Sequence, residues 1–117
     1  VDAQLDWMLE NGGMEFSNKR CSDSSSQLFN WAENHSLASP FVKNEKERSL
    51  VTATIDIDDS IDAEDIVSTL RANGIVDCDP YRKLGRNQIR VATFPSIEPD
   101  DVSQLIKCLD YVIEALA

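Results

Sequence analysis

The stretch SLVTATIDIDD, residues 49–59, decides the fold, because its side chains alternate between apolar and mostly polar positions. The two alternating sets are Val51, Ala53, Ile55 and Ile57 against Leu50, Thr52, Thr54 and Asp56. A period of two residues is typical of a strand that buries one face. The acidic pair at the end of the stretch favours a turn. The sequence therefore predicts a half-buried strand over residues 50–57.

Downstream of this strand, capping signals bound a helix, and two further strands follow. Asp62 suits the N-cap position, and Gly74 suits the position just past the last helical turn. These signals predict a helix over residues 62–73. Apolar or alternating runs then predict short strands over about 75–79 and 88–94.

Both ends of the chain are predicted to be helical. Pro99 marks the first turn of a helix over 99–116, whose apolar side chains recur three and four residues apart. Weaker periodicity predicts helices over 2–10 and 14–32. The apolar stripe of the longer one includes Met14, Cys21 and Leu28. Its serine-rich middle has poor helix propensity, so this helix requires support from neighbouring elements.

This order of elements predicts an α+β fold. The length of 117 residues fits a single small domain, with a helical segment over 1–35 and an α/β sandwich portion over 36–117. Because amphipathic elements must bury their apolar faces, helices are expected on one face of a small, largely antiparallel sheet.

Composition excludes several classes of partner. The formal net charge is −10, and both nucleic acids and anionic membranes require a basic surface. No apolar run reaches the length of about 20 residues that crosses a bilayer. The acidic start of the chain carries no signal-peptide pattern, so we expect a cytoplasmic protein.

The reactive side chains form no recognisable catalytic or metal-binding motif. The three cysteines are widely spaced, which argues against disulfides and against a metal site and favours buried thiols. The single histidine, His35, lies in a polar stretch without a cysteine or acidic partner at ligand spacing. We therefore expect no metal and no catalytic residue in this chain.

One basic stretch stands out against the acidic background. Residues 81–90 contain three arginines, one lysine and no acid, so the rest of the chain carries a formal −14. Arginine binds carboxylates and phosphates through paired hydrogen bonds, which favours an anion site. The alternative is that these bases only balance nearby acids for solubility. Arg90 fits this alternative least, because a charge inside a strand requires an anionic partner or an open sheet face.

Several of these stretches resemble a known enzyme family. ENGGM (10–14) and TLRANGIV (69–76) are similar to the C-terminal part of class V aminotransferases. PYRKLGRNQIRVATFP (80–95) and EPDDV (98–102) resemble one branch of the phosphoserine aminotransferases. The resemblance implies the C-terminal small domain of an enzyme that converts glutamate and 3-phosphohydroxypyruvate to 2-oxoglutarate and phosphoserine in serine biosynthesis.

The resemblance also implies roles for three arginines. Arg90 matches the arginine that binds the substrate α-carboxylate in this family. A His-Arg pair of the better-known branch contributes to the phosphate site, and Tyr81-Arg82 matches it here, with two extra residues before Arg90. Arg82 is thus a candidate phosphate ligand, and Arg86 is the competing one. Tyr81 departs from the family histidine.

The cofactor of the family is pyridoxal phosphate, and the resemblance implies that other parts of the enzyme hold it. None of the five lysines lies in the family's cofactor-lysine context; they are Lys19, Lys43, Lys46, Lys83 and Lys107. We therefore expect no cofactor on these residues alone, no activity of this part alone, and a homodimeric full-length enzyme. The alternatives are the same domain of another class V aminotransferase, or a free-standing regulatory module that binds an anionic metabolite.

Overall fold

A computed structural model describes all 117 residues and shows an α+β arrangement. Three antiparallel strands form the sheet in the order β1-β2-β3; they are β1 (Ala38–Pro40), β2 (Thr52–Ile57) and β3 (Gln88–Ala92). Four helices accompany them: α1 (Asp2–Glu10), α2 (Gly13–Asn34), α3 (Ala63–Ala72) and α4 (Pro99–Leu116). Two 3-10 turns, η1 (Glu45–Glu47) and η2 (Arg82–Leu84), lie in the connections.

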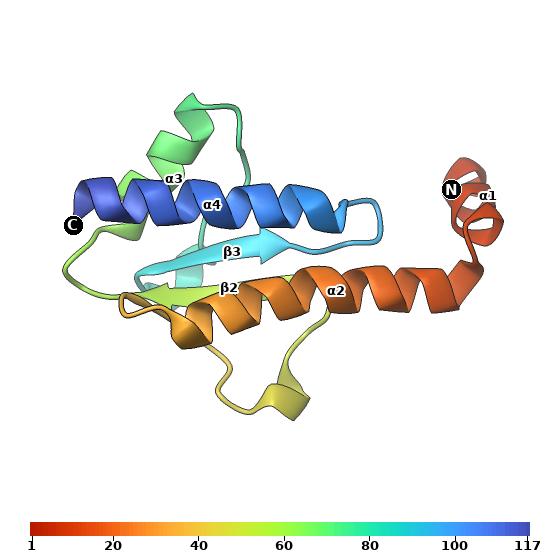
Figure 1. The fold of residues 1–117 in the computed structure, drawn as a ribbon, viewed down its shortest axis with the longest axis horizontal. Helices are drawn as coiled ribbons and strands as arrows, with labels where there is room; N and C mark the ends of the chain where they lie inside the picture. Colours follow the sequence, from red (N-terminus) through yellow and green to blue (C-terminus); the bar gives the residue numbers. More distant parts are fainter.

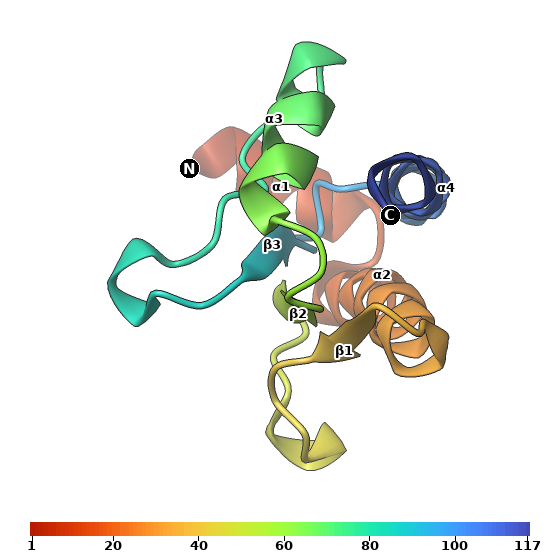
Figure 2. The same ribbon diagram turned by 90° about the vertical axis from the view of Figure 1, so that its left-hand side faces the viewer.

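The sheet has one covered face and one open face. Helices α2 and α4 lie together on the covered face, and α3 packs on α4 beside β3 (Figures 1 and 2). In β2 the side chains of Ala53, Ile55 and Ile57 point into the core, as the period of two predicts. The alternation predicted for this strand and the packing of helices on one face are both confirmed.

Local signals account for the helix boundaries. The Asp62 carboxylate accepts a hydrogen bond from the Glu64 amide at the start of α3, as an N-cap does. Pro99 occupies the first turn of α4. In the serine-rich part of α2, Ser24 and Ser25 are buried, so neighbouring elements supply the support that this run lacks by itself.

The strand predicted over residues 75–79 is wrong. Two residues of this stretch or at its border, Gly74 and Asp77, have positive φ angles of 85° and 65°, which turn the chain away from an extended path. Pro80 then lacks the amide that a ladder needs. A single hydrogen bond, from the Arg90 amide to the Cys78 carbonyl, joins the segment to β3.

In place of that segment, the sheet contains β1, a stretch that was not predicted to be a strand. Its three residues are too short to show a period, and Pro40 is tolerated because β1 lies at the edge of the sheet. The predicted strand over 88–94 ends at Ala92, and beyond it the Thr93 amide and hydroxyl donate to the carbonyls of Val51 and Leu50.

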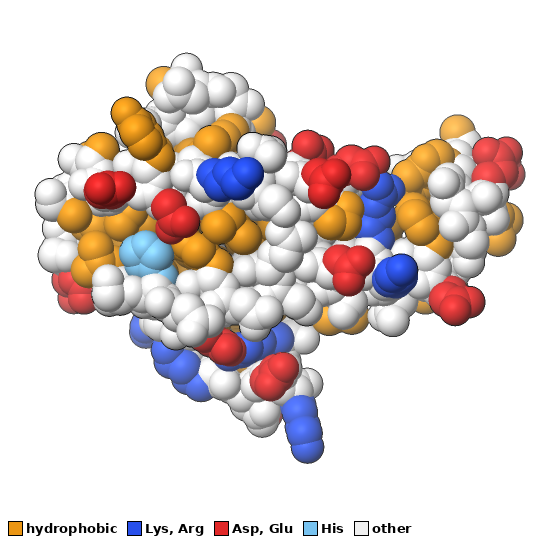
Figure 3. Space-filling model, in the orientation of Figure 1, with side chains coloured by type: hydrophobic (Ala, Val, Ile, Leu, Met, Phe, Trp, Pro, Cys, Tyr) orange, Lys and Arg blue, Asp and Glu red, His pale blue; other side chains and the backbone are white.

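Helix α1 buries little of its apolar face. Trp7 packs edge-on against Phe16 with 5.5 Å between ring centroids, and the Arg20 guanidinium stacks near both rings. Leu9 and Met14 nevertheless remain 69% and 78% exposed, so the predicted stripe of α2 begins only at Cys21. Hydrophobic side chains are accordingly visible at this end of the molecule (Figure 3).

The cysteines do not all follow the prediction of buried thiols. Cys21 and Cys78 are buried, and burial raises the pKa of both thiols, but Cys108 is exposed on α4.

No helix combines the length and the apolar character that crossing a membrane would require.

Candidate functional site

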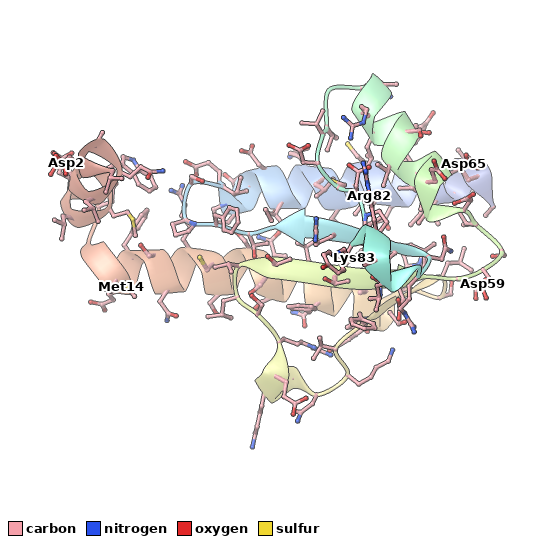
Figure 4. All side chains as sticks on the ribbon, turned by 180° about the vertical axis from the view of Figure 1, so that it is seen from behind. Asp2, Met14, Asp59, Asp65, Arg82 and Lys83 are labelled. Carbon is pink, nitrogen blue, oxygen red and sulfur yellow. The ribbon has the colours of Figure 1, made fainter.

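The basic stretch forms a turn and the start of β3 on the open side of the sheet. Its chain leaves the sheet on the side opposite α2 and α4 (Figure 2). Arg82 and Lys83 belong to η2 and lie in front of the strands when the open face is viewed (Figure 4). Gly85 follows with φ at 66°, a left-handed conformation that costs glycine little and lets the chain return toward β3.

A cavity of about 480 Å³ lies beside this turn. It is lined by four bases and two acids, together with Pro80 and Tyr81; the charged residues are Arg71, Arg82, Lys83, Arg90, Asp77 and Asp79. One hydrophobic residue lines it, so its surface suits a polar or charged ligand rather than an apolar one.

The arginines of this region differ in whether they already form an ion pair with a carboxylate of the protein. Arg71 pairs with Asp79 at 2.8 Å, and Arg86 pairs with Asp56 at 2.9 Å. Arg82 and Arg90 form no ion pair and no side-chain hydrogen bond. The cavity therefore contains two arginines whose forks are free to bind an added anion.

Arg90 lies on the open face of the sheet, one of the two situations that the sequence allowed for it. It stands opposite Thr54 in the register of β2 and β3 and is half-buried. Its guanidinium carbon lies 6.0 Å from the centroid of the Tyr81 ring, within the range of a cation–π contact.

Arg86 is held by Asp56 through two hydrogen bonds. The Arg86 Nε and Nη2 donate to Asp56 Oδ1 and Oδ2 at 3.2 and 2.9 Å, and Gln88 Nε2 donates to Oδ1 at 2.8 Å. Burial by itself would raise the pKa of the Asp56 carboxyl, but the hydrogen bonds from Arg86 and Gln88 outweigh it and the pKa is lowered. Asp56 is thus ionised at neutral pH, and both of its carboxylate oxygens accept hydrogen bonds.

The side chains present do not suit a covalently held pyridoxal cofactor. Such a group requires a lysine inside a pocket that also holds its ring and phosphate. All five lysines are exposed, and only Lys83 borders the basic cavity, where it lies on an exposed turn and not inside an enclosed pocket. No cluster of metal-ligating side chains occurs either. His35 accepts a hydrogen bond from the Leu37 amide at the end of α2, and thus has a local structural role.

Comparison with known proteins relates this arrangement to an enzyme family. No family model matches the chain. The phosphoserine aminotransferases of Rhodococcus opacus and Rhodococcus jostii are each 53% identical to it over 113 residues. A related protein of Mycolicibacterium vanbaalenii is 55% identical over the same length. The chain is homologous to the C-terminal part of phosphoserine aminotransferases. The alignments cover 97% of this chain and 30% of each relative.

Solved structures share the fold. A phosphoserine aminotransferase of Bacillus circulans superposes with a TM-score of 0.85 over 96% of this chain, at 15% identity. One from Cytophaga hutchinsonii gives 0.77 at 22% identity. A cystine C-S lyase, solved with cysteine persulfide, gives 0.68 at 12% identity. The fold therefore matches the phosphoserine aminotransferases but also occurs in an enzyme with another reaction, so the fold alone does not fix the substrate.

The sequence reasoning singled out the arginines but missed their partners. It identified Arg82, Arg86 and Arg90. The structure places Arg82 and Arg90 on one cavity, and Arg82 and Arg86 on a second one, with Arg86 paired to Asp56. The signal that could have found Asp56 was its position on the polar side of the alternating strand, where a charge requires a partner. The contact of Tyr81 with Arg90 had no signal of this kind.

Proposed function

We propose that the chain forms the substrate-binding small domain of a full-length phosphoserine aminotransferase, which transfers an amino group from glutamate to 3-phosphohydroxypyruvate. The observation that carries the proposal is the pair of uncommitted arginines, Arg82 and Arg90, on one polar cavity. Both substrates of such an enzyme carry an α-carboxylate, and one substrate pair also carries a phosphate. Two arginine forks suit two such anions.

Arg90 is proposed to bind the α-carboxylate. It matches the carboxylate-binding arginine of the family in sequence, and its position inside β3 fixes the start of its side chain more firmly than a loop would. Tyr81 offers an aromatic surface beside the guanidinium, which restricts the orientation of the fork without using its hydrogen-bond donors.

Arg82 is proposed to bind the phosphate, in preference to Arg86. The sequence left these two residues as alternatives. The paired hydrogen bonds from Arg86 to Asp56 favour Arg82, because recruiting Arg86 to a ligand would leave the ionised Asp56 without its main partner. Arg82 has no such bond to break and borders the same cavity as Arg90.

The cofactor is proposed to be held outside these residues. Pyridoxal phosphate supplies the electron sink for amino-group transfer in aminotransferases, and the exposed lysines of this chain offer it no enclosed site. We therefore expect the 117-residue chain alone to show no turnover of glutamate with 3-phosphohydroxypyruvate when the cofactor is added. Formation of 2-oxoglutarate can be followed directly, and sustained formation would overturn this expectation.

The Arg82→Ala variant of the full-length enzyme tests the phosphate role. Glutamate has no phosphate, so its half-reaction should change little, whereas the half-reaction of phosphoserine should weaken about tenfold or more, since a charge-assisted pair is lost. Single-turnover rates measured separately for glutamate and phosphoserine check the difference. Equal damage to both half-reactions would refute the assignment, and the same pattern from Arg86→Ala instead would transfer the role to Arg86.

A second candidate is the small domain of an enzyme that acts on another amino acid. The observation that supports this candidate is the cystine C-S lyase, which shares the fold and carries out another reaction. The Arg82→Ala experiment separates the two, because an enzyme without a phosphorylated substrate has no reason to depend on Arg82 for one substrate only. Sequence relatives named as aminotransferases favour an enzyme over a regulatory module. A homodimeric full-length enzyme and a cytoplasmic location stay predictions.

A further inference from the structure

The turn that carries Arg82 has few connections of its own to the rest of the molecule. Inside it, the Leu84 amide donates to the Tyr81 carbonyl at 3.1 Å. The side chains of Arg82, Lys83 and Leu84 are exposed, and none of them forms a hydrogen bond. Gly85 follows in a left-handed conformation, and no atom lies within 4 Å of the place where a Cβ would be. The place of the turn must therefore be set at its ends.

At the end that leads into β3, the Asn87 side chain fixes the entry to the strand through hydrogen bonds to α3 and to the end of β2. Arg86 is the residue that connects the turn itself to the open face of the sheet. Its fork donates two hydrogen bonds to the Asp56 carboxylate, and its guanidinium carbon lies 5.0 Å from the centroid of the Phe41 ring. Asp56 and Phe41 belong to β2 and to the residues that follow β1. The contact thus ties the turn across the open face to two other parts of the sheet.

Asp56 is itself fixed in orientation. Gln88, which stands opposite Asp56 in the register of β2 and β3, donates to Asp56 Oδ1 at 2.8 Å and is fully buried. The Asp56 side chain is only 16% exposed, whereas that of Arg86 is 50% exposed. A carboxylate that is oriented by a buried amide and shielded from water holds a bidentate arginine better than a mobile surface acid would.

From these contacts we infer that Asp56 is a positioning residue, which acts through Arg86 to hold the turn where Arg82 faces the same cavity as Arg90. Asp56 does not line that cavity and touches no ligand there. The inference rests on the proposed function for its effect on substrate, because only then does the place of Arg82 matter to phosphoserine. Its effect on the turn itself does not depend on that function.

The Asp56→Asn variant distinguishes this role from a ligand role of Arg86 by the sign of the effect. Asparagine keeps an acceptor for Gln88 but removes the charge that holds Arg86. If Asp56 positions the turn, phosphoserine should bind about three- to tenfold more weakly, the loss expected when a loosened side chain must be ordered again on binding. If Arg86 binds the phosphate, its release from Asp56 should leave the affinity unchanged or increase it.

The experiment uses the full-length enzyme with phosphoserine and glutamate as separate substrates. We expect Asp56→Asn to raise the KM for phosphoserine while the KM for glutamate stays within about twofold. The matched control is Asp59→Asn. Asp59 is an exposed acid whose side chain forms no hydrogen bond and which interacts with Arg86 far less than Asp56 does, so its replacement should leave both constants within about twofold. The double variant Asp56→Asn with Arg86→Gln should be no worse than the single one, because the two residues act as one unit.

Amide hydrogen exchange at Leu84, whose amide is hydrogen-bonded to the Tyr81 carbonyl, provides a readout that needs no substrate. Loss of the tie should speed exchange there in Asp56→Asn and not in Asp59→Asn. Unchanged exchange, or phosphoserine binding that is unchanged or tighter, would overturn the inference. If exchange is faster but Arg82→Ala and Arg90→Ala leave both half-reactions intact, the positioning of the turn stands and the proposed function fails.

Discussion

Replacing Arg90 by alanine in the full-length enzyme should slow the half-reactions of both glutamate and phosphoserine, each by about tenfold to more than a hundredfold. Both substrates carry the α-carboxylate that Arg90 is proposed to bind, so the loss cannot be confined to one of them. The free guanidinium on the open face has no carboxylate of the protein to fall back on. Single-turnover rates with each substrate in turn give the measurement.

Two further variants make the Arg90 result specific. Arg90→Lys keeps the positive charge but loses the planar fork, and it should recover only part of the rate. Lys46→Ala removes one positive charge from the exposed turn η1 and should leave both rates within about twofold. If Arg90→Ala leaves the glutamate half-reaction intact, the carboxylate role is wrong, and the match with the family loses its strongest residue.

The elements that sequence predicted well are those with a long periodic pattern. Helix α4 begins and ends at the predicted residues, because its apolar stripe runs over 18 residues and Pro99 fixes its start. Strand β2 was predictable because each of its core side chains alternates with a more exposed one. In such segments local preference and burial agree, so the pattern alone is sufficient.

The errors lie where a short segment depends on distant partners. The segment over 75–79 has strand-like residues, but positive φ angles at Gly74 and Asp77 bend it, and no pattern of apolar residues reports a backbone angle. The segment Ala38–Pro40 forms a strand only because β2 lies beside it. Helix α1 has an apolar face in sequence, yet none of its residues is buried in this chain.

The candidate site was predictable to the level of residue type. Four bases within ten residues indicated an anion site, and the position of Arg90 in a strand indicated an open sheet face. The sequence could not separate Arg82 from Arg86, because the difference between them is the contact with Asp56, 30 residues from Arg86. Such a contact depends on the register of β2 with β3 and on the path of the turn.

Asn87 offers the largest stability effect among the polar residues near the site. Its Oδ1 accepts a hydrogen bond from the Ala63 amide at 2.8 Å, at the start of α3. Its Nδ2 donates to the carbonyls of Ile61, Ile57 and Asp58 at 2.8, 3.1 and 3.3 Å. The side chain thus joins β3 to the end of β2 and to α3. Replacing it by alanine should lower the free energy of unfolding by about 2–4 kcal/mol, since several part-buried groups lose their partners together.

Urea unfolding of the chain, followed by the fluorescence of its two tryptophans, measures the Asn87→Ala effect. Asn30→Ala is the matched control, because Asn30 is exposed on α2 and its side chain forms no hydrogen bond; it should change the free energy by less than about 0.5 kcal/mol. Asn87→Asp should destabilise at least as much as alanine at neutral pH, because a carboxylate would then face three carbonyl oxygens without a proton to donate. Protonation of that carboxyl at acidic pH restores one donor, so the penalty of Asn87→Asp relative to the unchanged chain should shrink as the pH falls. A penalty that is small for alanine and independent of pH for aspartate would show that water can replace the Asn87 amide, and that β3 and α3 do not depend on it for their junction.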